Sequence, residues 1–234
     1  MPFSTFPFFF PPFSAIIYII MDKPKYIVVE GPIGVGKTSL VNLLIEEFGG
    51  RGILEEVEGN PFLPNFYRDR ERHAFQTQLF FLLSRYRQQS EISQQDLFSQ
   101  TTISDYLFAK DRIFANINLE ENELVLYDQV YQLLDARVTK PDLVIYLQAE
   151  PEVLMERIKR RGKGYEKSIS QTYLSDLVHA YNDYFFHYSE TPLLVINTSQ
   201  IDFVKRAGDF SQLIREIKRM KKGIQYFSPM GTGE

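Results

Sequence analysis

The sequence predicts an α/β fold in which helices cover both faces of a parallel sheet. Short apolar runs alternate with stretches of helical spacing from residue 24 to residue 220, which is the pattern of such a sheet. Residues 142–147 form a nearly continuous apolar run, as strands buried on both faces do. A glycine-rich turn follows the first apolar run and opens a helical stretch.

The expected elements follow one another in regular order. The strands are expected at residues 25–30, 52–57, 101–105, 142–147 and 192–197. The helices are expected at residues 38–48, 71–89, 106–115, 151–161, 170–188 and 202–220. Gly49 and Gly50 end the first helix, and Pro151 suits the first turn of another.

Residues 124–128 (Leu-Val-Leu-Tyr-Asp) allow two interpretations. Four apolar residues followed by aspartate resemble the acidic strand that holds magnesium in many nucleotide hydrolases. However, Leu124, Tyr127, Tyr131 and Leu134 continue at helical spacing, and no turn signal bounds the segment. We therefore expect a helix here.

Composition excludes several classes of protein. The 234 residues include 26 Lys+Arg and 30 Asp+Glu, which gives a net charge of −4. A mildly acidic chain lacks the basic face that duplex nucleic acid requires, so we expect no polymeric nucleic acid as a partner. The chain has no cysteine, which excludes disulfides and cysteine nucleophiles and fits a reducing, cytoplasmic location.

The two ends differ from the rest of the chain. Residues 3–13 hold six phenylalanines among prolines, and no lysine or arginine precedes Lys23. Prolines oppose a membrane helix, and a secretory signal would need a positive start, so we expect no membrane contact. We expect one domain over residues 23–222, an extension outside the fold over residues 1–22, and a flexible tail over residues 223–234.

The strongest motif is a phosphate-binding loop. The run Gly31-Pro-Ile-Gly-Val-Gly-Lys37-Thr38 matches G-x-x-x-x-G-K-[ST] between an expected strand and an expected helix. Its glycines let backbone N–H groups face phosphate oxygens, and the helix N-terminus adds partial positive charge. The residues expected to hold the phosphates of ATP are Gly31, Pro32, Ile33, Gly34, Val35, Gly36, Lys37, Thr38 and Ser39. The Thr38 hydroxyl is expected to hold Mg²⁺.

The rest of the sequence limits the class of phosphate-binding protein to which this chain can belong. A GTPase would usually carry an Asn-Lys-x-Asp motif, which does not occur here. A large ATPase would need a second acidic strand, and the one candidate is interpreted above as a helix. Small-molecule kinases remain.

In the long helix, Gln78 and Arg85 lie two turns apart on the apolar side, where they would either read a nucleobase or join two helices.

Residues 24–220 resemble the deoxynucleoside kinases, especially the bacterial deoxyadenosine/deoxycytidine and deoxyguanosine branch. The resemblance rests on the phosphate loop and on four further motifs in order. These are residues 55–67 (EEVEGNPFLPNFY), 75–85 (FQTQLFFLLSR), 104–111 (SDYLFAKD) and 157–162 (RIKRRG). It implies a five-stranded parallel sheet in the order 2-3-1-4-5 with an arginine-rich lid, ATP and Mg²⁺ as cofactors, and a homodimer.

The resemblance also implies roles for individual residues. Glu55 would be the general base for the sugar 5′-hydroxyl, beside Lys37, Asp105 and the lid arginines, which are Arg157 and Arg161. Lys163 is a further lid position, and Asp105 would help Thr38 to hold Mg²⁺. The deoxynucleoside would be bound by Glu55, Tyr67, Gln78, Arg85, Asp111 and Glu166. Asp202 and Phe203 match the loop around the adenine of ATP.

One position departs from the family pattern. Tyr106 stands where the motif that begins at Asp105 usually has an arginine, so the role of that arginine in holding the 5′ oxygen is in doubt. Lys110 or the lid are alternative sources of charge. The expected reaction is 5′-phosphorylation of a deoxynucleoside, with deoxyadenosine or deoxycytidine favoured because Asp111 would repel the O6 atom of guanine. The alternatives are a deoxyguanosine kinase, a nucleoside monophosphate kinase and a nucleotide-binding regulatory module without turnover.

Overall fold

The computed structural model describes residues 24–94 and 101–229 of the chain. The strands of this part are β1 (Tyr26–Glu30), β2 (Arg51–Ile53), β3 (Thr102–Ser104), β4 (Leu143–Gln148), β5 (Leu193–Asn197) and β6 (Ile224–Phe227). The helices are α2 (Lys37–Phe48), α3 (Leu63–Phe66), α4 (Arg70–Gln94), α5 (Lys110–Asn118), α6 (Glu121–Asp135), α7 (Pro151–Arg161), α8 (Gln171–Phe186) and α9 (Ala207–Arg219), with a 3₁₀ helix, η1 (Gly164–Ser168). The expected extension over residues 1–22 lies outside the described residues.

The described strands form one parallel sheet in the order β2-β3-β1-β4-β5-β6. The α/β class and the order of the first five strands are confirmed, but the expectation of five strands is wrong because β6 adds a sixth. β6 pairs with β5, with Leu193 opposite Ile224 and Ile196 opposite Phe227. The expected flexible tail over residues 223–234 is therefore also wrong for residues 224–227, because strand pairing fixes them.

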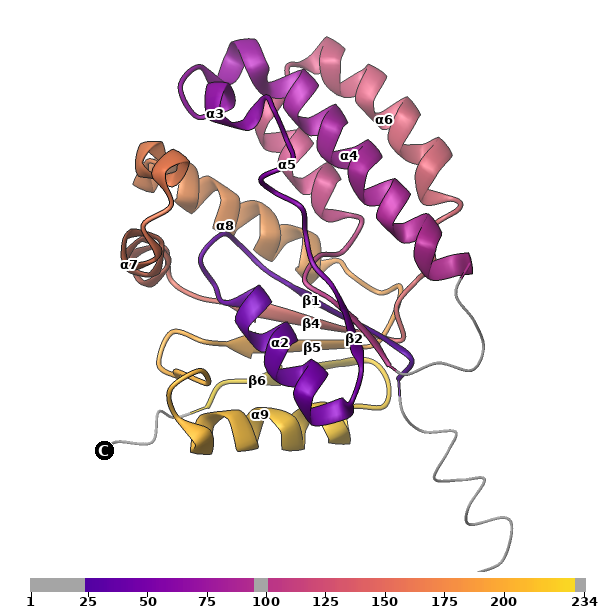
Figure 1. Cartoon of the computed structure of the whole chain (residues 1–234), viewed down its shortest axis with the longest axis vertical. Helices are drawn as coiled ribbons and strands as arrows, with labels where there is room; N and C mark the ends of the chain where they lie inside the picture. The colour runs from indigo at the N-terminus through magenta and orange to yellow at the C-terminus, as the bar shows by residue number, and fades with distance from the viewer. Residues whose placement is uncertain (1–23, 95–100, 230–234) are drawn as a thin grey trace, which may run out of the picture.

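Helices cover both sides of the sheet (Figure 1). α2 and α9 lie on one side, and α4, α5 and α8 lie on the other. All five residues of β1 and the first five of β4 are buried, as expected for central strands between two helical layers. A second apolar cluster around Leu82, Tyr127 and Tyr131 joins α4 to α5 and α6. No helix within the described ranges is both long and apolar enough to span a membrane.

Several boundaries differ from the expected ones for local reasons. The last helix begins at Ala207 rather than at residue 202, because the Asp202 side chain accepts hydrogen bonds from the N–H groups of Val204 and Lys205 and closes a turn. The second strand ends at Ile53, so residues 54–57 form a loop. The helix expected over residues 124–128 is confirmed as part of α6, which opens with a capping box between Glu120 and Glu123.

Candidate active site

The loop between β1 and α2 has the backbone of a phosphate cradle. Gly31, Gly34 and Gly36 all have positive φ, at 152°, 85° and 108°. A Cβ atom on Gly31 would lie 2.4 Å from the carbonyl oxygen of Leu147, and one on Gly36 would lie 3.1 Å from the ring of Phe203. Glycine is therefore required at residue 31 by steric exclusion as well as by backbone conformation.

A buried carboxylate fixes the start of this loop. Glu30, the last residue of β1, accepts hydrogen bonds from the N–H of Gly31 at 2.8 Å, the N–H of Leu107 at 2.7 Å and the hydroxyl of Tyr181 at 3.1 Å. Burial raises the pKa of Glu30, and the charges of Lys110 and Lys37 oppose that rise. Glu30 thus connects the phosphate loop to the segment after β3 and to α8.

Lys37 is folded back onto its own loop. Its Nζ donates to the carbonyl oxygens of Gly31 at 2.7 Å and Pro32 at 3.2 Å. Burial and the nearby Lys110 ammonium lower the pKa of Lys37 to about 8. Phosphate oxygens placed on the loop would replace the two carbonyl contacts and favour the charged lysine.

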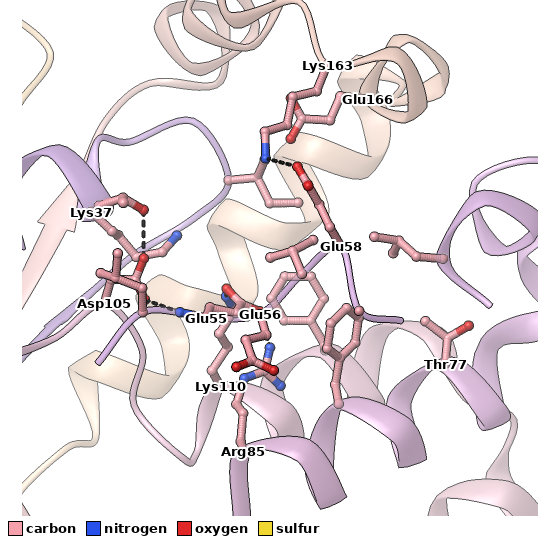
Figure 2. Close-up of a pocket in the computed structure, with 18 of the residues that line it drawn as sticks. Lys37, Glu55, Glu56, Glu58, Thr77, Arg85, Asp105, Lys110, Lys163 and Glu166 are labelled. Atoms are coloured by element: carbon pink, nitrogen blue, oxygen red, sulfur yellow. Dashed lines mark hydrogen bonds and ion pairs between the residues drawn. The ribbon is translucent and has the colours of Figure 1, made fainter. Parts of the chain in front are cut away.

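Thr38 and Asp105 meet beside the phosphate loop, where the Thr38 hydroxyl donates to Asp105 Oδ2 at 2.6 Å. The N–H of Glu55 donates to Asp105 Oδ1 at 2.7 Å (Figure 2). A hydroxyl and a carboxylate at this spacing are hard oxygen donors of the kind that Mg²⁺ prefers when substrate phosphates and water complete its shell. The described residues contain no cluster of three or more acidic or histidine side chains that would hold a metal without such help.

A cavity of about 510 Å³ lies next to the phosphate loop and is lined in part by Lys37 and Thr38. The phosphate loop, the segment after β2, α4, the start of α5 and the lid region (residues 157–163) contribute to its walls, together with η1. The polar residues that line it are Lys37, Thr38, Glu55, Glu56, Glu58, Tyr67, Thr77, Gln78, Arg85, Asp105, Lys110, Arg161, Lys163 and Glu166. Most of the residues expected to bind the deoxynucleoside are therefore in one cavity.

Glu55 lies at the centre of a charged network in this cavity (Figure 2). Arg85 donates to its Oε1 atom and Lys110 donates to its Oε2 atom. Burial alone would raise the pKa of Glu55, but the charges of Lys110 and Arg85 outweigh burial and hold that pKa well below its usual range. Glu55 is thus an ionised carboxylate close to Asp105 that can accept a proton, and the two cations on its oxygens make it a weaker base than a free carboxylate.

The expected base-reading residues divide into two layers. Gln78 and Arg85 line the cavity from α4, as their shared helical face predicts. Asp111 is fully buried and lies outside the described cavity lining, paired with the Nη1 group of Arg85. The structure therefore places Arg85 toward the cavity and Asp111 behind it, which removes the basis for direct repulsion between Asp111 and a guanine O6 atom.

Residues next to α3 and residues of the lid region line the same cavity. Tyr67 and Glu166 both line it, and Arg161 pairs with Glu166 through its Nε atom at 3.1 Å and through its Nη2 atom. Lys163 pairs with Glu58 at 3.2 Å. The lid cations thus have acidic partners from the acceptor side of the site.

Arg157 faces a second cavity of about 530 Å³, which includes residues 34–39 of the phosphate loop and also Asp202 and Phe203. Its guanidinium donates to the carbonyl of Val35 at 3.2 Å and to the hydroxyl and carbonyl of Thr198 at 3.1 and 2.8 Å. In this arrangement Arg157 joins the phosphate loop to the loop that carries Asp202. The two cavities meet at Lys37 and Thr38, as a donor site and an acceptor site must.

Glu30 and Lys110 take part in the hydrogen-bond and ion-pair network of the site, and the sequence does not predict them as site residues. Glu30 ends an otherwise apolar strand directly before the phosphate loop, and an acid at that position is a signal of a buried carboxylate. The sequence indicates Lys110 only as an alternative source of charge, because its context resembles that of any surface lysine at the start of a helix. Its contact with Glu55 depends on tertiary structure.

Comparison with known proteins agrees with this geometry. Residues 27–222 match the family model "Deoxynucleoside kinase". The chain is 35% identical over 205 residues to a deoxyguanosine kinase of Bacillus subtilis, covering 86% of this chain and 99% of that protein. It is 29% identical to a deoxyadenosine kinase of Lactobacillus acidophilus, covering 86% and 98% of the two chains.

The fold has solved counterparts. The structure of deoxyadenosine kinase from M. mycoides with bound dCTP superposes with a TM-score of 0.72 at 22% identity, covering 83% of this chain and 99% of that one. The family match, the similarity to named kinases and the two cavities that meet at a phosphate loop lead to one conclusion. The chain belongs to the deoxynucleoside kinase family of phosphotransferases.

Proposed function

We propose that this protein transfers the γ-phosphoryl group of ATP to the 5′-hydroxyl of a deoxynucleoside. The observation that carries the proposal is the position of Glu55, an ionised carboxylate in the wall of the 510 Å³ cavity, whose backbone N–H donates to the same Asp105 carboxylate that accepts from Thr38 of the phosphate loop. A carboxylate there can take the proton of a hydroxyl that approaches the phosphate loop from the 510 Å³ cavity.

In this proposal the reaction is an in-line displacement. Glu55 accepts the 5′-hydroxyl proton while the 5′ oxygen forms a bond to the γ-phosphorus, and the bond from that phosphorus to the bridging oxygen of ADP breaks. Lys37 and the backbone N–H groups of residues 31–38 orient the phosphates. Thr38 and Asp105 would hold Mg²⁺, which neutralises phosphate charge when bound. Arg161 supplies positive charge from the lid.

The sugar and the base bind further from the loop. Tyr67 and Glu166 lie where they would hold the 3′ side of the sugar, and Gln78 lines the cavity where a base would lie. A glutamine amide presents one donor and one acceptor, which match the exocyclic amine and ring nitrogen of adenine or cytosine. This match supports deoxyadenosine or deoxycytidine as the preferred substrate.

A second candidate substrate is deoxyguanosine. It is favoured by the placement of Asp111 behind Arg85, because guanidinium donors at the cavity wall suit the O6 and N7 acceptors of guanine. The named function of the Bacillus subtilis relative at 35% identity also favours it.

One assay tests both the reaction and the base. We expect ADP release, measured by a coupled assay with ATP and Mg²⁺, to depend on an added deoxynucleoside. The highest kcat/KM for deoxyadenosine or deoxycytidine would support the first candidate, and the highest value for deoxyguanosine would support the second. Turnover with deoxynucleoside monophosphates alone would contradict the proposal, and so would ATP binding without any turnover.

The cavity itself argues against a monophosphate acceptor. Such an acceptor would bring a second phosphate among the carboxylates of Glu55, Glu56, Glu58 and Glu166. Of the cations that line the cavity, Arg85, Lys110, Arg161 and Lys163 pair with acids of this chain, and Lys37 belongs to the phosphate loop. A neutral sugar hydroxyl avoids this repulsion.

We also propose a homodimer in an ATP-supplied, cytoplasmic setting. α4 and α6 pack against each other, and the apolar side chains of Leu83, Val125, Leu126 and Leu133 on these two helices are exposed. Exposed apolar side chains on two neighbouring helices are typical of an interface. Light scattering should give the mass of a dimer for the natural chain, and Leu133→Asp should shift it to the mass of a monomer. A monomeric natural chain would contradict this part of the proposal.

A further inference from the structure

Lys110 is a buried cation in the cavity, and the reaction as proposed above gives it no task. It is the first residue of α5, only 5% of its surface is exposed, and it lines the acceptor cavity. A lysine is almost never buried to this degree unless it is paired. Its ammonium contacts the carboxylate of Glu55.

We propose that Lys110 is a positioning residue for Glu55, a proposal that rests on the function proposed above. In this arrangement Lys110 holds the Oε2 atom of Glu55 throughout the reaction cycle. The Oε1 atom is then the one that receives the 5′-hydroxyl of the acceptor. Lys110 thereby fixes which oxygen of the carboxylate is presented to the substrate.

The partners of the two Glu55 oxygens differ in a way that supports this assignment. Arg85, on Oε1, has a second carboxylate partner in Asp111, so it can leave Glu55 and remain paired. Lys110, on Oε2, has Glu55 as its acidic partner within the described part of the chain. Releasing Lys110 would break its one ion pair in the described part of the chain and leave a buried ammonium with only the more distant charge of Glu30 to balance it, which is unfavourable. An entering hydroxyl should therefore displace Arg85 and leave Lys110 in place.

The backbone that leads into Lys110 is held by several hydrogen bonds. The N–H of Leu107 donates to Glu30 at 2.7 Å, and the hydroxyl of Ser104 donates to the carbonyl of Tyr106 at 2.9 Å. The N–H of Lys110 donates to the carbonyl of Leu107 at 3.0 Å, and its Nζ lies 5.6 Å from the ring centroid of Phe114. A side chain held on such a frame can orient a carboxylate with the accuracy that proton transfer requires.

A double-mutant cycle on the full chain tests the proposal. The variants are Lys110→Met, Glu55→Gln and the two together, with kcat and KM measured by ADP release. We expect Lys110→Met to lower kcat on the order of 10- to 100-fold, because the carboxylate is misplaced, and to change KM for ATP by less than about threefold. In the Glu55→Gln background the same change should lower kcat by less than about twofold, because its target is already gone.

Controls separate positioning from stability. Tyr106→Phe removes a buried hydroxyl that has no described partner from the same segment and should keep kcat and the melting temperature close to the natural values. If Lys110→Met does not fold, Lys110→Gln keeps a hydrogen-bond donor without the charge and enters the same cycle.

Two results would overturn the inference. One is an unchanged kcat in a folded Lys110 variant, and the other is an equal fall in kcat with and without Glu55, which would mean that Lys110 acts elsewhere. A natural chain that turns over none of the four deoxynucleosides would instead contradict the proposed function.

Discussion

The two walls of the active site are built in different ways. The ATP wall is made of backbone, and its shape is set by glycines whose missing side chains leave no room for alternatives. The polar part of the acceptor wall consists of charged side chains that neutralise one another, with Glu55 between Lys110 and Arg85, and Arg161 on Glu166. The backbone of the ATP wall is thus formed before ligand binds, and Lys37 exchanges its two carbonyl contacts for phosphate oxygens. In the acceptor wall, ion pairs between side chains must open when a substrate enters.

The largest expected effect is on the acceptor wall. Glu55→Gln keeps the shape of the side chain but removes the proton acceptor, so kcat should fall by about 10²- to 10⁴-fold while KM for ATP hardly changes. Glu56→Gln, at the neighbouring residue of the same cavity, is the matched control and should keep kcat within about threefold. Calorimetry should still detect deoxynucleoside binding to the Glu55 variant. If Glu55→Gln kept the kcat of the natural chain, Glu55 would not be the catalytic base. The acceptor wall would then differ from the ATP wall in structure but not in the chemical role assigned to it here.

The next effect is on the ATP wall and concerns stability. Gly31→Ala places a Cβ atom 2.4 Å from the Leu147 carbonyl oxygen at a φ of 152°, so the free energy of unfolding should fall by roughly 3 kcal/mol. Gly208→Ala is the control, since it lies in α9 with no heavy atom within 4 Å of the added Cβ. Alanine favours helix there, so a gain of up to about 1 kcal/mol is expected. Urea unfolding measures both, and equal stabilities would show that the loop is more adaptable than its glycines imply.

A smaller effect should appear in the pH dependence. The pKa of Lys37 is lowered to about 8 by burial and by Lys110, so the free protein loses the Lys37 charge as pH rises through 8. The value of kcat/KM for ATP should therefore fall about tenfold per pH unit above that point. Bound phosphates favour the charged lysine, so kcat should fall less. Lys37→Arg is the control, because arginine keeps its charge and should flatten the profile even at lower activity. A profile for the natural chain that stays flat to pH 9 would contradict the lowered pKa.

The smallest effect should come from the N-terminal end. β1 begins at Tyr26, and every residue assigned above to either wall lies within residues 30–203. Deleting residues 1–20 should therefore leave kcat and the melting temperature nearly unchanged. Loss of folding on that deletion would show that the phenylalanine cluster packs on the domain and would add a third component to the comparison.

Local pattern was sufficient to predict most of the fold and the ATP wall. The phosphate loop and its flanking elements are contiguous in sequence, and the buried strands β1, β4 and β5 are apolar up to their last residue. β6 escaped prediction because it is short and alternates between exposed and half-buried residues, so it lacks the continuous apolar run of the central strands. Lys110 and the two-layer arrangement of Arg85 and Asp111 escaped for a different reason. The role of these residues depends on which acidic side chain each one contacts in the folded chain. Residue type and local sequence do not predict such contacts.

The ion pair between Lys163 and Glu58 has a consequence for how quickly substrate reaches the site. It crosses from the lid to the segment after β2, and the Glu58 side chain is 77% exposed. Ion pairs in such a setting contribute only about 0–1 kcal/mol and weaken as salt rises. Thermal motion should therefore break this contact many times within a single turnover. The ion pair at the entrance of the cavity would therefore hinder the entry of a nucleoside only weakly. The residence time of a bound nucleoside would be set by its contacts inside the cavity.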